Sequence, residues 1–174
     1  MKIAVVYKSK YGTTKQYAEW VAAELDADLF EIAEIKPVDL TVYDVVIHGG
    51  GLYGGGIDGL KITKRKSPQR LVVFTVGVAD PITTDYSEIL QLAFSTEELT
   101  TTKVFHLRGG IDYKKLNFAH KTIMGMMQKA LLKKNADKRS EEEQQILATY
   151  GKKVDFVDRT TIEPLVDYIK SLDC

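Results

Sequence analysis

Residues 3–21 read IAVVYKSKYGTTKQYAEWV, and the prediction of the fold starts from this segment. The first five residues form a short apolar run without alternation, which is typical of a β-strand covered on both faces. A loop rich in hydroxyl groups follows, and beyond it Tyr17, Ala18 and Val21 recur at helical spacing. The segment therefore predicts a strand, a tight loop and a helix, which is the first part of a β–α–β unit.

The alternation of β-rich runs and amphipathic segments continues along the chain without a repeat or a linker. Four further strands are predicted, over residues 28–32, 43–48, 70–76 and 103–107. Capping-box sequences indicate helix starts in three places, at Ser95 with Glu98, at Ser140 with Glu143 and at Thr160 with Glu163. We predict an α/β fold, namely a doubly wound five-stranded parallel sheet with helices on both faces, as a single domain over residues 1–174.

The chain has 174 residues, with 24 basic and 24 acidic side chains, so its formal net charge is zero. Cys174 is the only cysteine, which excludes an intrachain disulfide and a metal site built on paired thiolates. The three histidines lack metal-ligand spacing, so we predict no metal site. We expect a cytoplasmic protein. Because no segment reaches the roughly 20 apolar residues of a membrane span, contact with the inner face of the cell membrane would be peripheral.

The neutral sum conceals a basic block, because residues 100–139 hold ten basic and two acidic side chains. We expect a basic helical insert at about 109–139. On a helical wheel its apolar residues share one face: Leu116, Ala119, Ile123, Met126, Met127 and Ala130. The simplest interpretation is a helix that packs on the core and leaves its lysines in solvent.

Three other roles for the insert follow from its composition. Phe118 and Leu132 project among the lysines, which would suit an anionic membrane surface. The methionines would suit an adaptable substrate pocket. Nucleic-acid binding ranks last, because lysines predominate over arginines and no platform of several aromatic rings accompanies them. We therefore predict no nucleic-acid partner.

The loop after the first strand, KSKYGTT at residues 8–14, combines hydroxyl groups with the N-terminus of the following helix. Amide groups, the positive end of the helix dipole and O–H donors meet there in one small volume, which predicts a phosphate site. The single glycine and the missing lysine before the last threonine exclude the P-loop pattern for triphosphates, and the GxGxxG turn is also absent. The loop suits a monophosphate ester.

The segment resembles the N-terminal signature of the flavodoxin family in eight residues: Val5, Val6, Tyr7, Ser9, Gly12, Thr14, Ala18 and Val21. The resemblance implies a flavodoxin-like fold and FMN as the cofactor. It also implies that the first loop binds the cofactor through Ser9, Lys10, Tyr11, Gly12, Thr13 and Thr14. The alternative is a solvent-exposed loop with an ordinary helix cap.

Two further loops are candidates for contacts with the flavin ring. Residues 49–56, GGGLYGGG, combine glycines that let the backbone approach a flat ring with one aromatic wall. By resemblance, the ring would contact Gly51, Leu52, Tyr53 and Gly54 in this loop, with Tyr53 stacked on it. After the fourth strand, the ring's pyrimidine edge would contact Thr75, Val76, Gly77 and Ala79. No aromatic residue there offers a second wall, so either the open face admits a flat substrate or quinone, or another loop supplies the wall.

The basic block refines the resemblance, because flavodoxins that shuttle electrons are typically very acidic. Arg108, Gly109, Gly110 and the Lys- and Met-rich insert resemble the menaquinone-dependent protoporphyrinogen dehydrogenase branch of the family. That branch implies an oxidoreductase of heme biosynthesis with a porphyrinogen substrate and a quinone acceptor. Arg108 is then the candidate for binding substrate carboxylates.

Two alternative functions stay open at this point. One is a non-enzymatic electron carrier that serves protein redox partners, and the other is a small FMN-dependent NAD(P)H:quinone reductase. No catalytic side chain is predicted, because the flavin would supply the chemistry. His48 ends a strand near the expected cofactor, so it would be either a structural histidine or a proton-transfer group.

Overall fold

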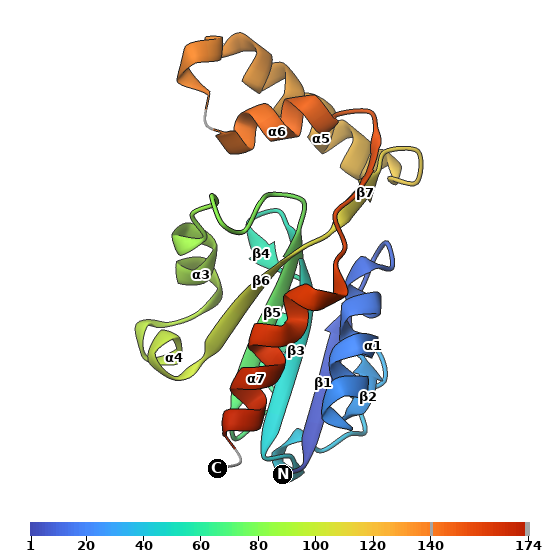
Figure 1. Cartoon of the computed structure of the whole chain (residues 1–174), viewed down its shortest axis with the longest axis vertical. Coiled ribbons are helices and arrows are strands. Elements are labelled where there is room, and N and C mark those ends of the chain that lie inside the picture. The colour runs from blue at the N-terminus through green and yellow to red at the C-terminus, as the bar shows by residue number, and fades with distance from the viewer. Residues whose placement is uncertain (140, 173–174) are drawn as a thin grey trace.

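A parallel sheet forms the centre of the computed structural model, which describes residues 1–139 and 141–172 (Figure 1). Its five strands run in the order β2 (Asp28–Glu31), β1 (Ile3–Lys8), β3 (Val45–Tyr53), β5 (Leu71–Gly77) and β6 (Lys103–Arg108). A two-residue strand, β4 (Gly56–Ile57), pairs antiparallel with the end of β3. The strand order reverses between β1 and β3, so the predicted doubly wound five-stranded parallel sheet is confirmed.

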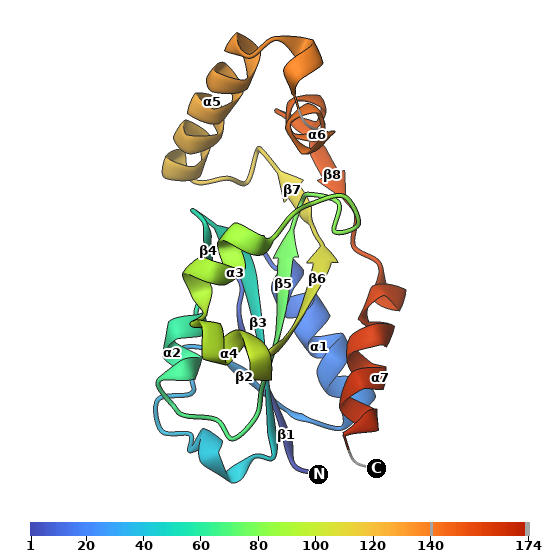
Figure 2. The ribbon, with the colours of Figure 1, turned by 90° about the vertical axis from the view of Figure 1, so that its left-hand side faces the viewer.

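Helices cover both faces of the sheet, which explains why the apolar runs of the strands are continuous (Figure 2). Val5 packs with Tyr17 of α1 (Thr13–Leu25) and Leu165 of α7 (Glu163–Ser171). The next residue, Val6, packs on the other face with Leu40 of the short helix η1 (Leu40–Val42). Helices α2 (Leu60–Lys64), α3 (Ser87–Ala93) and α4 (Thr96–Thr101) complete this second layer.

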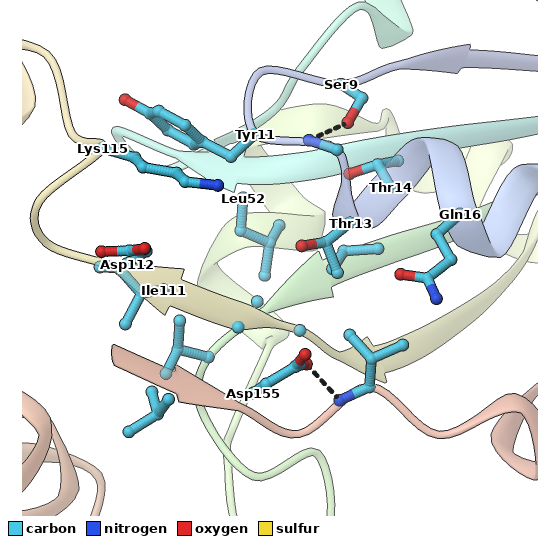
Figure 3. A pocket seen from close by; sticks show the side chains of 18 of the residues that line it. Ser9, Tyr11, Thr13, Thr14, Gln16, Leu52, Ile111, Asp112, Lys115 and Asp155 are labelled. Atoms are coloured by element: carbon cyan, nitrogen blue, oxygen red, sulfur yellow. Dashed lines mark hydrogen bonds between the residues drawn. The ribbon is translucent and has the colours of Figure 1, made fainter. Parts of the chain in front are cut away.

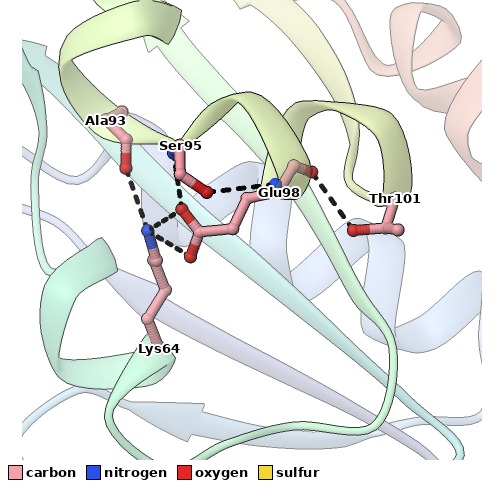
Figure 4. A network of polar contacts seen from close by, with 5 residues as sticks. All are labelled: Lys64, Ala93, Ser95, Glu98 and Thr101. Atoms are coloured by element: carbon pink, nitrogen blue, oxygen red, sulfur yellow. Dashed lines mark hydrogen bonds and ion pairs between the residues drawn. The ribbon is translucent and has the colours of Figure 1, made fainter.

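The predicted capping box at Ser95 and Glu98 is confirmed (Figure 4). The Glu98 amide donates to Ser95 Oγ over 3.2 Å, and the Ser95 amide donates to Glu98 Oε2 over 2.7 Å. The Lys64 ammonium lies 2.6 Å from Glu98 Oε1 and also donates to the carbonyl of Ala93. The box therefore starts α4 and ties it to α2 and to the end of α3.

The capping box predicted at Thr160 and Glu163 is wrong. Asp158 accepts from the Thr160 amide over 2.9 Å and caps a short 3₁₀ helix, η3 (Arg159–Ile162), from which α7 continues at Glu163 without a side-chain cap. The Asp158 carboxylate accepts from both the amide and the hydroxyl of Thr160, so the side chain that caps this turn is Asp158 and not Thr160. In the third predicted box, Ser140 lies outside the described residues.

A separate lobe, residues 110–155, leaves the sheet beyond β6 and stands at the carboxyl ends of the strands (Figure 1). Its neck is an antiparallel pair of strands, β7 (Gly110–Asp112) and β8 (Lys153–Asp155). Between them run α5 (Phe118–Lys133), η2 (Ala136–Lys138) and α6 (Glu141–Thr149), and α5 packs against α6. The lobe thus extends beyond the basic segment expected at 109–139.

Helix α5 does not pack its predicted apolar face on the core. Ile123 and Met126 keep 55% and 60% of their surface exposed, and Ala119 and Ala130 on the same face are exposed as well. The residue that α5 buries is Leu131. A helical wheel finds an apolar face correctly, but it does not tell whether another element covers that face.

His48 of β3 is fully buried and holds the turn between β4 and α2. Its Nε2 lies 3.0 Å from the Asp58 carbonyl, which only accepts, so Nε2 carries the proton and donates. Thr63 Oγ1 lies 2.8 Å from Nδ1. Burial lowers the pKa of His48 to about 4, so the ring is neutral at pH 7. Of the two roles considered, a structural histidine and a proton-transfer group, these contacts support the structural one.

We expect the stability of the protein to depend on pH through His48. The unfolded chain has an ordinary histidine pKa near 6.5, so it binds a proton that the fold rejects as the pH falls from 6.5 towards 4. The free energy of unfolding therefore keeps its highest value, as far as His48 is concerned, above pH 6.5. It decreases as the pH falls from 6.5 towards 4, by up to about 1.4 kcal/mol per pH unit. The free energy of unfolding, measured by urea denaturation at a series of pH values, should change less steeply with pH in His48→Gln than in the parent protein. An equal slope in both proteins would contradict this assignment.

Candidate cofactor site

A cavity of about 390 Å³ opens at the carboxyl ends of β1, β3 and β5, between the loop after β1 and the neck of the lobe (Figure 3). Its volume is within the range of small-molecule and cofactor sites. The core side and the lobe side each supply part of its lining. The site expected from the sequence is therefore a real cavity, in the place where doubly wound folds bind ligands.

The first loop shapes one end of the cavity for an anion. Gly12 has a φ of 95°, a left-handed conformation that favours glycine, and it turns the chain into α1 at Thr13. Among the described residues no side chain caps α1, so the amides of its first turn remain available to a ligand at the positive end of the helix dipole. Ser9 Oγ accepts from the Gly12 amide over 3.1 Å, which leaves its own proton free to be donated. This arrangement suits a phosphate group.

Most of the predicted cofactor-binding residues line this cavity: Ser9, Tyr11, Gly12, Thr13, Thr14, Leu52, Tyr53, Val76 and Gly77. Lys10 and Gly54 instead line a neighbouring cavity that shares Tyr53 with the first. Gly51, Thr75 and Ala79 are not among the lining residues of either. Thr75 Oγ1 lies 2.7 Å from His106 Nδ1, a hydrogen bond between neighbouring strands.

Tyr53 lies in an aromatic cluster that joins the core to the lobe. The His120 ring of α5 stacks on it, with centroids 5.4 Å apart and an angle of 9° between the planes. Tyr11 OH forms a hydrogen bond with His120 Nδ1, and the Lys10 ammonium lies 4.3 Å from the centre of the Tyr53 ring. Burial raises the pKa of Tyr53 to about 12, so its phenol keeps its proton at neutral pH. No sequence pattern indicated that His120 belongs to this site.

The neck of the lobe supplies the second wall that the sequence left open. Ile111, Leu116 and Val154 of the lobe line the cavity with apolar side chains, and Figure 3 shows Ile111 across from Leu52. Charged residues of the lobe line it as well: Asp112, Lys115, Lys153 and Asp155. Figure 3 shows Lys115 extending from the lobe towards the core side of the cavity. The lobe is therefore the element that would supply a wall from another loop, which was one of the two accounts considered.

The remaining lining residues that sequence reasoning missed are Gln16, Val78, Gly109, Gly110 and Val157. The glycine pair was the available signal. A Cβ on Gly109 would stand 2.7 Å from Val76 Cγ1 and 3.2 Å from Thr13 Cγ2, and one on Gly110 would stand 2.6 Å from the Val154 carbonyl. Both glycines are therefore needed where the chain passes between the phosphate end and the neck.

Arg108, the candidate for binding substrate carboxylates, does not line the cavity. Its Nε donates to the Val78 carbonyl over 3.0 Å, and Nη1 lies 3.7 Å from Asp80 Oδ2. The guanidinium also lies 3.7 Å from the centre of the Phe156 ring. These contacts fix the loop after β5 against the chain that follows β8, which is a structural task.

Tyr17 ties both ends of the lobe to α1. Its fully buried hydroxyl donates to the Arg108 carbonyl over 2.7 Å and accepts from the Asp158 amide over 3.1 Å. Arg108 ends the last strand before the lobe, and Asp158 follows soon after β8. Since α1 begins at the end of the cavity that the loop after β1 forms, this hydroxyl sets the neck at a defined place relative to that loop.

Across residues 1–139 and 141–172, no group of three or more His, Cys, Asp or Glu side chains is placed to hold a metal ion. The site therefore consists of backbone amides, hydroxyl groups, an aromatic cluster and apolar walls. Such a set is suited to an organic cofactor with a flat ring and a phosphate.

The comparison with protein families gives one match, in which the model described as "Flavodoxin domain" covers residues 4–141. No curated protein sequence matches the chain. Among solved structures, a flavodoxin, WrbA-like protein from Agrobacterium tumefaciens is 27% identical, over 46% of this chain and 62% of that one, with a TM-score of 0.40. This chain thus spans less than two thirds of that protein.

Two further solved structures are similar over a longer part of the chain. A flavoprotein in complex with FMN from Lactobacillus acidophilus is 16% identical over 62% of this chain and 91% of that one, with a TM-score of 0.44. Oxidised flavodoxin 2 from Bacillus cereus is also 16% identical, over 85% of this chain and 94% of that one, with a TM-score of 0.41.

We expect Tyr17→Phe to loosen the neck of the lobe. The change leaves the Arg108 carbonyl and the Asp158 amide without their buried partner, which costs about 1–3 kcal/mol of unfolding free energy. Amides of the neck and of Asp158 should exchange hydrogen faster than in the parent protein. Tyr168→Phe is the matched control, since no hydrogen bond of the Tyr168 hydroxyl occurs within the described part of the chain. Equal effects of the two changes would contradict the role of Tyr17.

Proposed function

The chain belongs to the flavodoxin family, and we propose that it is an oxidoreductase of the protoporphyrinogen dehydrogenase type, with a quinone as electron acceptor. Its cofactor is FMN. When bound, FMN supplies one- and two-electron redox chemistry, while the protein provides binding, orientation and the local charges. In each two-electron step, the substrate would lose two hydrogens and one quinone would become a quinol.

The residues of the cavity fit the parts of FMN. Ser9, Thr13 and the first amides of α1 would hold the phosphate. Leu52 and Tyr53 would contact the flavin ring from the core. The apolar wall of the neck would cover the ring from the lobe and keep water away from it. These assignments are proposals that follow from the shape and chemistry of the cavity.

One observation carries the proposal of an enzyme over an electron carrier, namely that the lobe helps to enclose the cavity. A carrier exchanges single electrons with protein partners through an exposed flavin edge, and a lobe over that edge would obstruct such partners. An enzyme that oxidises a small molecule needs an enclosed place beside the flavin. The lobe therefore supports a small-molecule substrate.

The surface of α5 supports a peripheral contact with an anionic membrane, where a lipid-soluble quinone would be found. Phe118 keeps 87% of its surface exposed, and Ile123, Met126 and Leu132 each keep more than half. Exposed lysines surround them: Lys121, Lys129 and Lys133. Within the described residues, no helix is both long and apolar enough to cross a bilayer. We therefore propose that the protein works at the inner face of the cell membrane, held by this helix.

Turnover by the purified, FMN-loaded protein tests the proposal. We expect porphyrin to form from protoporphyrinogen in the presence of a menaquinone analogue, together with loss of the oxidised quinone. Rapid oxidation of NAD(P)H by the quinone without porphyrinogen would instead favour the reductase. Single-electron exchange with a protein partner, without turnover of either small molecule, would favour the carrier. A protein that takes up no FMN would contradict all three functions.

Sedimentation with vesicles tests the membrane contact. We expect the protein to sediment with vesicles that contain anionic lipid and to remain free with neutral ones. Lys129→Gln should weaken binding about fivefold, because a basic residue near an anionic surface contributes about 1 kcal/mol. Ile123→Asn should weaken binding by removing an apolar contact. Ile82→Asn is the matched control, since Ile82 is 92% exposed but lies outside the lobe. Equal binding to anionic and neutral vesicles would refute the electrostatic contribution.

A further inference from the structure

We propose that the second cavity, which shares Tyr53 with the cofactor site, binds the anionic groups of the small molecule that exchanges electrons with the flavin. This inference rests on the proposed function and names a place for the substrate. The cavity has a volume of about 570 Å³ and lies over β4 and the start of α2. Because both cavities contact Tyr53, a molecule held in the second would lie next to the flavin ring in the first.

Three lysines give this cavity its positive charge. Lys8 and Lys10 share one carboxylate, that of Asp58, whose two oxygens lie 2.9 Å and 3.5 Å from the respective ammonium nitrogens. Lys61 also lines the cavity, and its ammonium has no ion pair among residues 1–139 and 141–172. Two positive charges therefore remain unbalanced among these four side chains, which suits a ligand with two negative charges.

The pairing of Lys10 is itself incomplete. At 3.5 Å its ammonium forms no hydrogen bond with Asp58 Oδ2, and this buried oxygen has no hydrogen-bond partner within the described part of the chain. The ammonium therefore keeps its protons for another acceptor, while its charge stays close to the Tyr53 ring. An anionic group that enters the cavity would meet a donor that is already in place.

The floor of the cavity is fixed and leaves room for a ligand. The hydrogen bond from His48 to the Asp58 carbonyl anchors the turn that carries Asp58, and Gly59 lets this turn approach Lys8, since a Cβ there would stand 3.0 Å from Lys8 Cβ. At Gly54, by contrast, a Cβ would meet no atom within 4 Å. The lysines thus line a cavity that has room for a ligand, and the backbone turn beneath it is fixed by hydrogen bonding.

Apolar side chains line the cavity together with the lysines. Ile62 and Leu92 line it and keep 44% and 69% of their surface exposed, and Tyr53 continues the apolar surface towards the cofactor. A ligand that matches both kinds of lining has an apolar body with negatively charged groups. Carboxylates of a porphyrinogen and phosphates of a nicotinamide dinucleotide both meet this description, and they share the chemistry of oxygen anions.

Binding measured without turnover tests this inference. The probes are protoporphyrin IX, which carries two carboxylates, its dimethyl ester, which carries none, and NADPH, each followed by its own fluorescence with the FMN-loaded protein. We expect Lys61→Gln to raise the dissociation constant of the diacid about fivefold, as expected for the loss of one exposed ionic contact. Lys61→Glu should raise it further. Neither change should alter the affinity for the ester or for FMN.

Lys170→Gln is the matched control, because Lys170 is an exposed lysine of α7 that lines neither cavity. Sensitivity of NADPH binding, and not of diacid binding, to the change at Lys61 would support the site with a dinucleotide as its ligand. Equal affinities for the diacid and the ester, together with NADPH binding that ignores Lys61, would overturn the inference. This result is distinguishable from failure of the proposed function, which is read from FMN uptake and turnover.

Discussion

The arrangement of the whole site depends on the buried hydroxyl of Tyr17. It binds the carbonyl of Arg108, at the end of β6, and the amide of Asp158, just beyond the lobe, so that both passages of the chain meet on α1. Each of these hydrogen bonds contributes about 0.5–1.5 kcal/mol, and together they hold the two passages at one place. Because the same helix begins at the proposed phosphate site, one side chain sets the position of the lobe relative to that site.

The position of the lobe also determines where the positive charge of the protein lies. The chain is neutral as a whole, but its acidic residues predominate in the sheet domain and ten of its basic residues lie between positions 100 and 139. Folding gathers most of this positive charge on the lobe, beyond the carboxyl ends of the strands (Figure 1). A neutral total is therefore compatible with a cationic surface that would attract anionic partners over distances near a Debye length.

Tyr53 divides the region beside the strands into two parts of different chemistry. On one side are amides, hydroxyl groups and apolar walls, which suit a phosphate and a flat ring. On the other side are lysines and exposed apolar side chains around an open glycine turn. The buried, neutral His48 stabilises the turn beneath these lysines by its hydrogen bond to the Asp58 carbonyl. A cofactor and a substrate would thus meet across one aromatic ring.

Local pattern was enough to predict the five strands of the parallel sheet, their alternation with helices and the loop at residues 8–14, because each depends on residues that are close in the sequence. It did not predict the Tyr17 contacts, whose partners are 91 and 141 residues away, or the wall from the neck, or His120 beside Tyr53. Nor could it tell that Ile123 and Met126 stay exposed. Periodicity reports which side chains share a face, whereas what covers that face depends on packing between distant segments, and only the folded chain brings those segments together.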